Sequence, residues 1–156
     1  MITQVQLQQI EKWLYTNARP LEIAKWNLIF DKGTKTCLVD EMLKYQNVDG
    51  GFGGGFEPDI HTPDSTTISS AEAIILSQDF GLDLSADWAK NLLSWYENTV
   101  KDTPDIWERV PKSIYDHPHA HGGVMTLTRD SSPILMLWWR LHCYRVQVHS
   151  VCLVKK

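Results

Sequence analysis

The sequence has few cysteines and no long apolar segment. Its three cysteines, Cys37, Cys143 and Cys152, lie far apart, which argues against a disulfide framework or a clustered zinc site. No stretch approaches the roughly 18 to 20 apolar residues of a membrane span, and the glutamine-rich start does not resemble a signal peptide. We therefore predict a cytoplasmic protein with no membrane span and with no metal or other cofactor.

A strong excess of one charge is also lacking. The 156 residues include 15 basic and 19 acidic side chains, a net charge of −4, which gives no electrostatic reason to expect a nucleic-acid partner. The balance nevertheless changes along the chain, because residues 1–120 carry a net charge of −8 and residues 121–156 a net charge of +4. This change divides the chain into a predicted domain, residues 1–120, and a tail, residues 121–156.

The alternating pattern of a β-strand is missing, and apolar residues recur instead at helical spacing. The first predicted helix covers residues 4–17 after the N-cap Thr3, the second begins at Pro20, and the third covers residues 36–45. Residues 101–120 contain three prolines and are expected to be irregular.

Two further helices follow a glycine-rich stretch. We expect Thr62 to cap the fourth helix, with Pro63 at its first position, Asp64 beside the positive end of its dipole and Gly81 at its end. A fifth covers residues 84–96. Five helices in hairpin order predict an all-α fold of stacked αα units.

The glycine-rich stretch, residues 46–64, holds five of the nine glycines of the chain. Glycines this dense indicate positive φ angles or a close approach to another surface. No Gly-Lys-Ser/Thr follows, and no strand precedes the stretch, so neither a phosphate-binding P-loop nor a dinucleotide-binding turn is predicted.

Residues 45–54 (Tyr-Gln-Asn-Val-Asp-Gly-Gly-Phe-Gly-Gly) resemble the Gln-x-x-x-Gly-Gly-Phe/Trp signature of α/α-toroid proteins, which include squalene and terpenoid cyclases and the β subunits of protein prenyltransferases. Residues 18–21, 57–59, 62–65, 107–111 and 118–120 look like the corresponding segments of a bacterial prenyltransferase-like group. The resemblance covers most of residues 15–120. It implies a partial α/α toroid, about half of an (α/α)6 barrel.

In such toroids the signature is structural, and the resemblance implies the same role here. The amide of Gln46 would bind exposed helix-terminal groups, and Phe52 would pack between helical pairs. The residues expected to form this structural motif are Gln46, Asp49, Gly50, Gly51, Phe52, Gly53, Thr62 and Asp64.

The catalytic motifs of the characterised toroids are not found in this chain. The Asp-x-Asp-Asp acid motif of terpene cyclases is absent, and Cys37, expected in the core, lacks the neighbours of a prenyltransferase zinc site. The tryptophans Trp13, Trp26, Trp88, Trp95 and Trp107 are likewise expected to be buried. The weak candidates for acid/base chemistry are Glu57, Asp59, His61, Asp116 and His119.

Residues from about His121 onward are interpreted as a frameshift product that truncates a longer protein. The resembled group continues Pro-His-Ala with Pro-Trp-Trp, and loss of one C from CCA TGG TGG yields codons for the His-Gly-Gly found at residues 121–123. The alternative is a native, divergent C-terminal helix. A truncated toroid would expose an open edge, through which we expect self-association.

Three functions stay open at this point. The first is a prenyltransferase- or terpene-cyclase-like protein that binds an apolar or isoprenoid ligand in its full-length form. The second is a carbohydrate-active α/α-toroid enzyme, and the third is a non-catalytic interaction domain. Whether the protein is an enzyme is left open, and this 156-residue form is not expected to be catalytically competent.

Overall fold

The computed structural model describes residues 2–100 and 111–120, which belong to one compact unit of the chain. Within these residues the structure contains α-helices, one 3-10 helix and two isolated β-bridges, but no β-strand. The all-α prediction is therefore confirmed for the described residues, whereas the toroid arrangement stays a prediction. The proposed frameshifted tail lies outside the described residues, as do Trp107 and His121.

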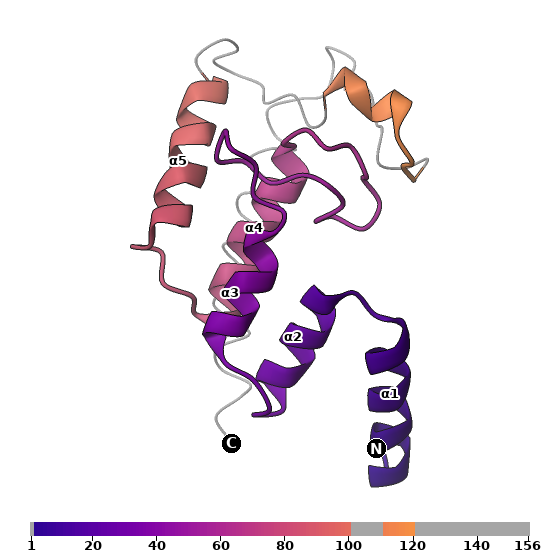
Figure 1. Ribbon diagram of the computed structural model, residues 1–156. Coiled ribbons are helices and arrows are strands. Elements are labelled where there is room, and N and C mark those ends of the chain that lie inside the picture. Colours follow the sequence, from indigo (N-terminus) through magenta and orange to yellow (C-terminus); the bar gives the residue numbers. More distant parts are fainter. Residues whose placement is uncertain (1, 101–110, 121–156) are drawn as a thin grey trace, which may run out of the picture. The chain divides into compact units, whose positions relative to one another are not determined.

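Within the described residues, five α-helices and a 3-10 helix follow one another in sequence (Figure 1). Their bounds are α1 (Gln4–Asn17), α2 (Pro20–Ile29), α3 (Lys35–Leu43), α4 (Thr67–Phe80), α5 (Asp87–Val100) and the 3-10 helix η1 (Lys112–Asp116). The first three agree with the predicted helices to within a few residues.

Local sequence explains most of these helix ends. Thr3 forms a reciprocal capping box with Gln6 at the start of α1, and Pro20 occupies the first turn of α2. Thr34 caps α3 by accepting a hydrogen bond from the Cys37 amide at 3.2 Å. Gly81 ends α4 in the left-handed conformation, with a φ of 58°.

The predicted start of α4 is wrong by about one turn. The N-cap is Thr66, whose side chain accepts a hydrogen bond from the Ser69 amide at 3.0 Å, and Thr62 does not cap a helix. The backbone from Thr62 to Thr66 instead pairs with the glycine-rich loop, because the Gly54 amide binds the Thr62 carbonyl at 2.8 Å and the Thr66 amide binds the Phe52 carbonyl at 2.9 Å. These tertiary bonds compete with a helical turn and outweigh the local helix-start signal.

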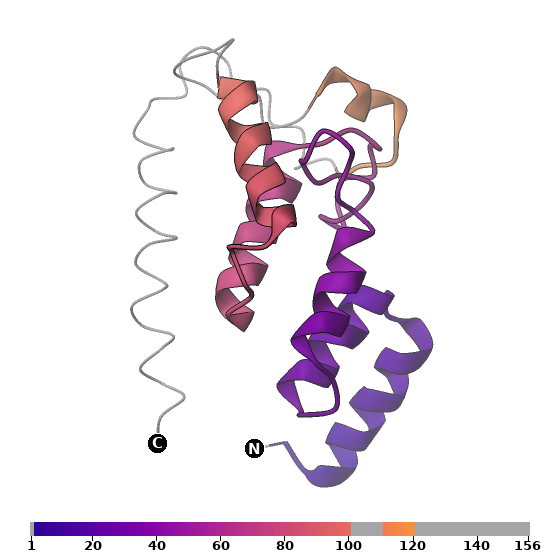
Figure 2. The same cartoon turned by 60° about the vertical axis from the view of Figure 1, so that its left-hand side comes forward.

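The hydrophobic core joins α2, α3, α4, α5 and the glycine-rich loop. Helices α2 and α3 pack against each other, and both views show α5 running alongside α4 (Figure 2). The hydroxyl of Tyr96 in α5 donates to the carbonyl of Thr67 in α4 at 3.4 Å. The buried members of the core are Leu21, Ala24, Leu38, Met42, Phe52, Phe56, Ala73, Leu76, Leu82, Trp88, Leu92 and Trp95.

Helix α1 departs from the predicted pattern of burial. It has no buried residue, and Trp13 is 63% exposed although its helical spacing predicted a core position. Helix α1 packs on α2, and its tryptophan side chain lies outside the hydrophobic core. Trp26 is half-buried against Phe30, whereas Trp88 and Trp95 are buried as predicted.

The expectation that Cys37 is buried is also wrong. The residue lies in the first turn of α3 and is exposed, while Leu38 and Met42 on another side of the same helix are fully buried. The thiol accepts a hydrogen bond from the Thr34 hydroxyl at 3.2 Å. The periodicity of α3 therefore places its apolar side toward the core and Cys37 outside it.

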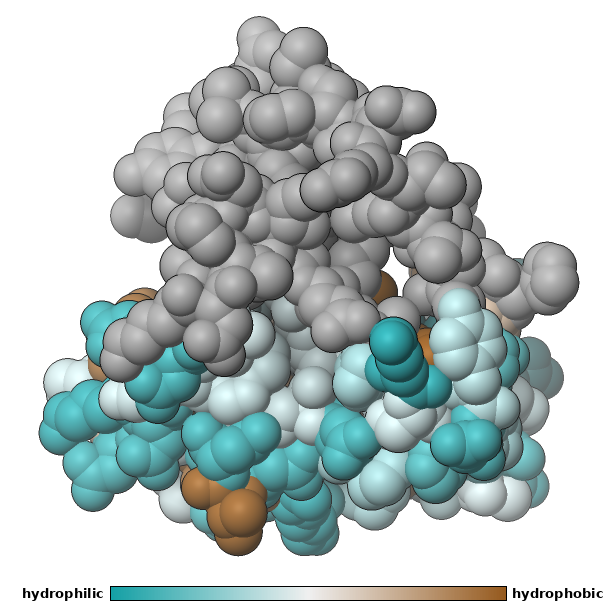
Figure 3. Space-filling view, turned by 90° about the horizontal axis from the view of Figure 1, so that it is seen from above, coloured by the Kyte–Doolittle hydropathy of each residue, from teal (hydrophilic) through white to brown (hydrophobic). Residues whose placement is uncertain are grey.

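The face shown in Figure 3 is mostly hydrophilic where the described residues form it, with isolated hydrophobic residues between them. Across residues 2–100 and 111–120, no helix has the combination of length and apolar character that a membrane crossing requires.

Candidate functional site

The glycine-rich stretch, residues 46–64, forms a loop that connects α3, α4 and α5, and we call this loop the joint. The side-chain amide of Gln46 donates to the carbonyl of Gly50 at 2.9 Å and to the carbonyl of Trp88 at 2.8 Å, in the first turn of α5. Gln46 and Phe52 also form an isolated antiparallel bridge. Gln46 thus reaches the start of a helix, although its acceptor there is a carbonyl, and the unpaired groups at a helix start are amides.

Asp49 binds three parts of this joint with one carboxylate. Its Oδ1 accepts hydrogen bonds from the Gly51 amide at 3.0 Å and from the Ser65 hydroxyl at 2.7 Å. Its Oδ2 accepts a hydrogen bond from the indole nitrogen of Trp95 at 3.1 Å. The carboxylate therefore connects the loop, the segment before α4 and the middle of α5, which is a structural use of the charge.

Two glycines of the joint lie too close to another part of the backbone to carry a side chain. Gly50 has a φ of 95°, and a Cβ there would lie 2.3 Å from the carbonyl oxygen of Asn91. At Gly53, a Cβ would lie 2.2 Å from the carbonyl oxygen of Asp64. The close approach of backbone to backbone accounts for these two glycines without any ligand.

A hollow of about 610 Å³ lies over the joint, lined by residues 46–49 and 63–65. Its polar groups already bind one another, since the side-chain amide of Asn47 donates to the Pro63 carbonyl at 2.9 Å and to the Ser65 hydroxyl at 3.0 Å. The carboxylate of Asp64 accepts a hydrogen bond from Ser113, whose hydroxyl also lies 3.2 Å from that of Thr62. These contacts leave few free polar groups for a ligand.

The predicted acid/base candidates are brought near one another through the backbone. Ile60 and His119 form an antiparallel bridge, the His61 amide binds the Pro118 carbonyl at 3.1 Å, and the Ala120 amide binds the Asp59 carbonyl at 2.9 Å. The side chains of four candidates are nevertheless exposed, namely those of Asp59, His61, Asp116 and His119. In the part of the chain that the structure describes, no three His, Cys, Asp or Glu side chains are placed to hold a metal ion.

A second pocket lies between α2, residues 56–58 of the glycine-rich loop and α4, and we call it the α2–α4 pocket. Its volume is about 210 Å³, which is below the usual 300–1,000 Å³ of ligand sites and suits a small molecule. Glu57 is the one predicted acid/base candidate that lines it. The lining residues are Arg19, Glu22, Lys25, Phe56, Glu57, Pro58, Glu72, Ile75, Leu76, Asp79 and Phe80.

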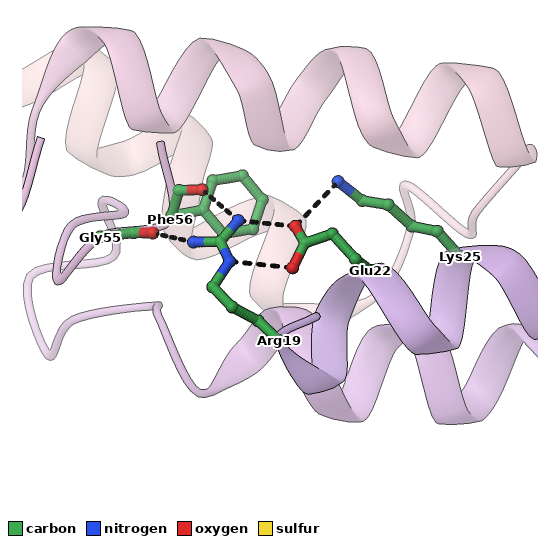
Figure 4. A network of polar contacts seen from close by, with 5 residues as sticks. All are labelled: Arg19, Glu22, Lys25, Gly55 and Phe56. Atoms are coloured by element: carbon green, nitrogen blue, oxygen red, sulfur yellow. Dashed lines mark hydrogen bonds and ion pairs between the residues drawn. The ribbon is translucent and has the colours of Figure 1, made fainter. Parts of the chain in front are cut away.

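Arg19 closes one side of the α2–α4 pocket (Figure 4). Its guanidinium pairs with both oxygens of Glu22, at 2.8 and 2.6 Å, and donates to the carbonyls of Gly55 and Phe56. Burial acts to raise the pKa of Glu22, but the hydrogen bonds and charge of Arg19 outweigh it and hold that pKa below its usual value. The ammonium of Lys25 lies 3.9 Å from the same carboxylate.

Three other carboxylates line the pocket without such a partner. The side-chain carboxylates of Glu57, Glu72 and Asp79 form no hydrogen bond or close ion pair within the described residues. Burial raises the pKa of Glu72, and the negative charges of Glu57 and Asp79 raise it further against the opposing effect of Lys25. Functional sites often contain a half-buried carboxylate whose pKa is raised in this way.

Sequence reasoning missed Glu72, although the sequence holds a signal for it. Glu72 is the only charged residue between Asp64 and Asp79, in a segment of small and apolar residues. Glu72, Ile75, Leu76, Asp79 and Phe80 follow the i, i+3, i+4, i+7, i+8 spacing of one helix face. A charged residue on a face that is otherwise largely apolar marks a polar position in a partly buried environment.

The raised pKa of Glu72 predicts how stability depends on pH. Its folded-state pKa exceeds its unfolded value, so its contribution is fully present below the unfolded pKa and is lost as pH rises through the folded pKa. We expect Glu72→Gln to gain stability relative to the unmodified chain as pH increases from about 4 to 7. Urea unfolding at each pH measures this gain, Glu97→Gln controls for the lost charge, and a pH-independent difference would contradict it.

Comparison of the chain with protein-family models, curated proteins and solved structures finds no match. The resemblance to α/α toroids therefore stays a prediction, and the pocket must be interpreted from its own residues.

Proposed function

We propose that this chain is a ligand-binding part of an α/α-toroid-type protein and that it holds a small organic molecule in the α2–α4 pocket. One observation carries the proposal, namely that the same small pocket is lined by apolar side chains and by three carboxylates that form no hydrogen bond or close ion pair within the described residues. Ligand sites commonly combine apolar side chains with a few polar groups that orient the ligand.

The lining favours a polar ligand over an isoprenoid chain. Six of the eleven lining residues are charged, whereas an isoprenoid requires a largely apolar cavity. The apolar contribution comes from Phe56, Ile75, Leu76 and Phe80, which offer room for one ring or a short aliphatic group. An isoprenoid ligand in a central cavity of a longer form stays a prediction, and carbohydrate chemistry and a non-catalytic interaction role stay alternatives.

The proposal is tested by filling the pocket. Ile75 is half-buried on the pocket wall, and Ile75→Trp would occupy much of the space. The full chain and this variant are titrated calorimetrically with a monosaccharide, an isoprenyl alcohol and an arylalkyl amine. We expect at least one of the polar compounds to bind the unmodified chain and to lose at least tenfold in affinity in Ile75→Trp.

The matched control is Leu93→Trp, because Leu93 is exposed on α5 and does not line the pocket. Circular dichroism confirms that both tryptophan variants keep their helices. If none of the compounds binds in a manner sensitive to Ile75→Trp, or if only the isoprenyl alcohol does, the proposed function is wrong.

A further inference from the structure

The charges of the α2–α4 pocket do not balance. Four carboxylates line it, from Glu22, Glu57, Glu72 and Asp79, against the two cations of Arg19 and Lys25. Arg19 is already engaged by Glu22 and by the loop carbonyls, and Lys25 approaches Glu22 at 3.9 Å. Among the described residues the three remaining carboxylates form no close ion pair, and the cations act on them only at longer range, Arg19 on Glu57 and Lys25 on Glu72.

These carboxylates also affect one another. The charges of Glu57 and Asp79 both disfavour the ionised form of Glu72, while Lys25 favours it. A positive group placed among them would be attracted by all three, and a neutral group would not. Glu57 and Glu72 are half-buried and Asp79 is exposed, so attraction to the first two carboxylates is less screened by water than attraction between charges on an open surface.

The apolar side chains of the same pocket limit what kind of cation fits. Phe56, which is 5% exposed, and Leu76 belong to the hydrophobic core, and Phe80 packs against it. Aromatic and aliphatic surface of this kind favours an organic body over a hydrated ion. A metal ion is further disfavoured because no three potential ligands within the described part of the chain are placed to coordinate it.

We infer that the ligand of the α2–α4 pocket carries an ammonium or comparable organic cation, which binds among Glu57, Glu72 and Asp79 while a small apolar body packs on Phe56 and Phe80. The inference rests on the proposed function and adds the charge of the ligand to it. Lys25 is the competing cation of the site, because it lies 3.9 Å from Glu22 and its charge also favours the ionised form of Glu72.

Three probes of nearly equal size and different charge test this inference. Benzylammonium, benzyl alcohol and benzoate are titrated calorimetrically into the full chain. The same titrations of Ile75→Trp show whether each probe loses affinity when the pocket is filled. We expect benzylammonium to bind at least tenfold more tightly than benzyl alcohol, and benzoate to bind most weakly. Addition of salt should reduce the preference for the ammonium.

Variants of the lining charges separate binding from structure. Lys25→Gln removes the competing cation, so benzylammonium should bind several-fold more tightly while benzyl alcohol is unaffected. Glu72→Gln should weaken benzylammonium several-fold. Lys44→Gln is the matched control, because Lys44 forms a similar i, i+3 ion pair with Glu41 on α3, away from the pocket.

The affinity for benzylammonium should also rise with pH, because a proton on Glu72 competes with the bound cation. The other charged groups facing Glu72 are Glu57, Asp79 and Lys25. Benzyl alcohol enters the same surroundings without a charge, so its affinity at each pH is the reference for benzylammonium.

The outcomes distinguish the two proposals. If benzyl alcohol binds as tightly as benzylammonium and both are displaced by Ile75→Trp, the pocket binds ligands but the inferred charge is wrong. If Lys25→Gln fails to tighten ammonium binding relative to Lys44→Gln, the inferred position of the cation is wrong. If no probe and no compound of the earlier panel responds to Ile75→Trp, both proposals are wrong.

Discussion

Gly53→Ala should destabilise the protein by about 3 kcal/mol or more. A Cβ at this position would lie 2.2 Å from the Asp64 carbonyl oxygen, 2.8 Å from the Asp64 carbonyl carbon and 2.9 Å from the Pro63 carbonyl oxygen. All three atoms belong to backbone, which cannot move aside as a flexible side chain can. Urea unfolding followed by circular dichroism measures the loss, and a variant that does not fold at all agrees with it.

Gly54→Ala is the matched control for this prediction. Gly54 has a φ of 62°, but a Cβ there would meet no atom within 4 Å. Its replacement therefore costs only the left-handed backbone conformation, about 1 kcal/mol. If Gly53→Ala is no less stable than Gly54→Ala, the segment before α4 does not approach the loop as closely as described.

Phe52→Ala is expected to cost about 3 to 5 kcal/mol. The ring is fully buried and packs against Phe56, with ring centroids 5.2 Å apart, in a core that the helices and the loop share. Its removal would leave a cavity at the joint, where the Phe52 amide also binds the Ser70 hydroxyl at 3.0 Å. Calorimetric or chemical unfolding of the variant measures the effect.

Val48→Ala provides the comparison, because Val48 lies in the same loop and is fully exposed. Its stability should stay within about 0.5 kcal/mol of the unmodified chain. A cost for Phe52→Ala that is no larger than that of Val48→Ala would mean that the loop does not contribute to the core.

The fold was largely predictable where the signals were local. The capping box at Thr3, the first-turn proline Pro20 and the terminal glycine Gly81 each act within one helical turn, so the sequence alone reveals them. The start of α4 was not predictable in this way, because Thr62 and Thr66 both match an N-cap. Pairing of the intervening backbone with residues 52–54 decides between them, and such pairing depends on tertiary structure.

The same reason limits prediction of the candidate site. Glu57 was identified because it follows the glycines of the loop, whereas the other candidates, Asp59, His61, Asp116 and His119, do not line the α2–α4 pocket. Periodicity in α1 suggested a core position for Trp13, but periodicity cannot tell whether another element covers a helix face. The sequence sets Glu72 apart as a charged residue in an apolar segment, but its raised pKa depends on the burial and on the neighbouring charges that the tertiary structure provides.

The hydrogen bonds of the joint have a consequence for the order in which the protein folds. The bond from Gln46 to Trp88 spans 42 residues, that from Asp49 to Trp95 spans 46, and the contact of Thr62 with Ser113 spans 51. Contacts between residues so distant in sequence form slowly, since the entropy of closing the intervening loops is lost before any bond forms. Helical segments nucleate locally within microseconds, so we expect the rate of folding to be set by the assembly of the glycine-rich joint.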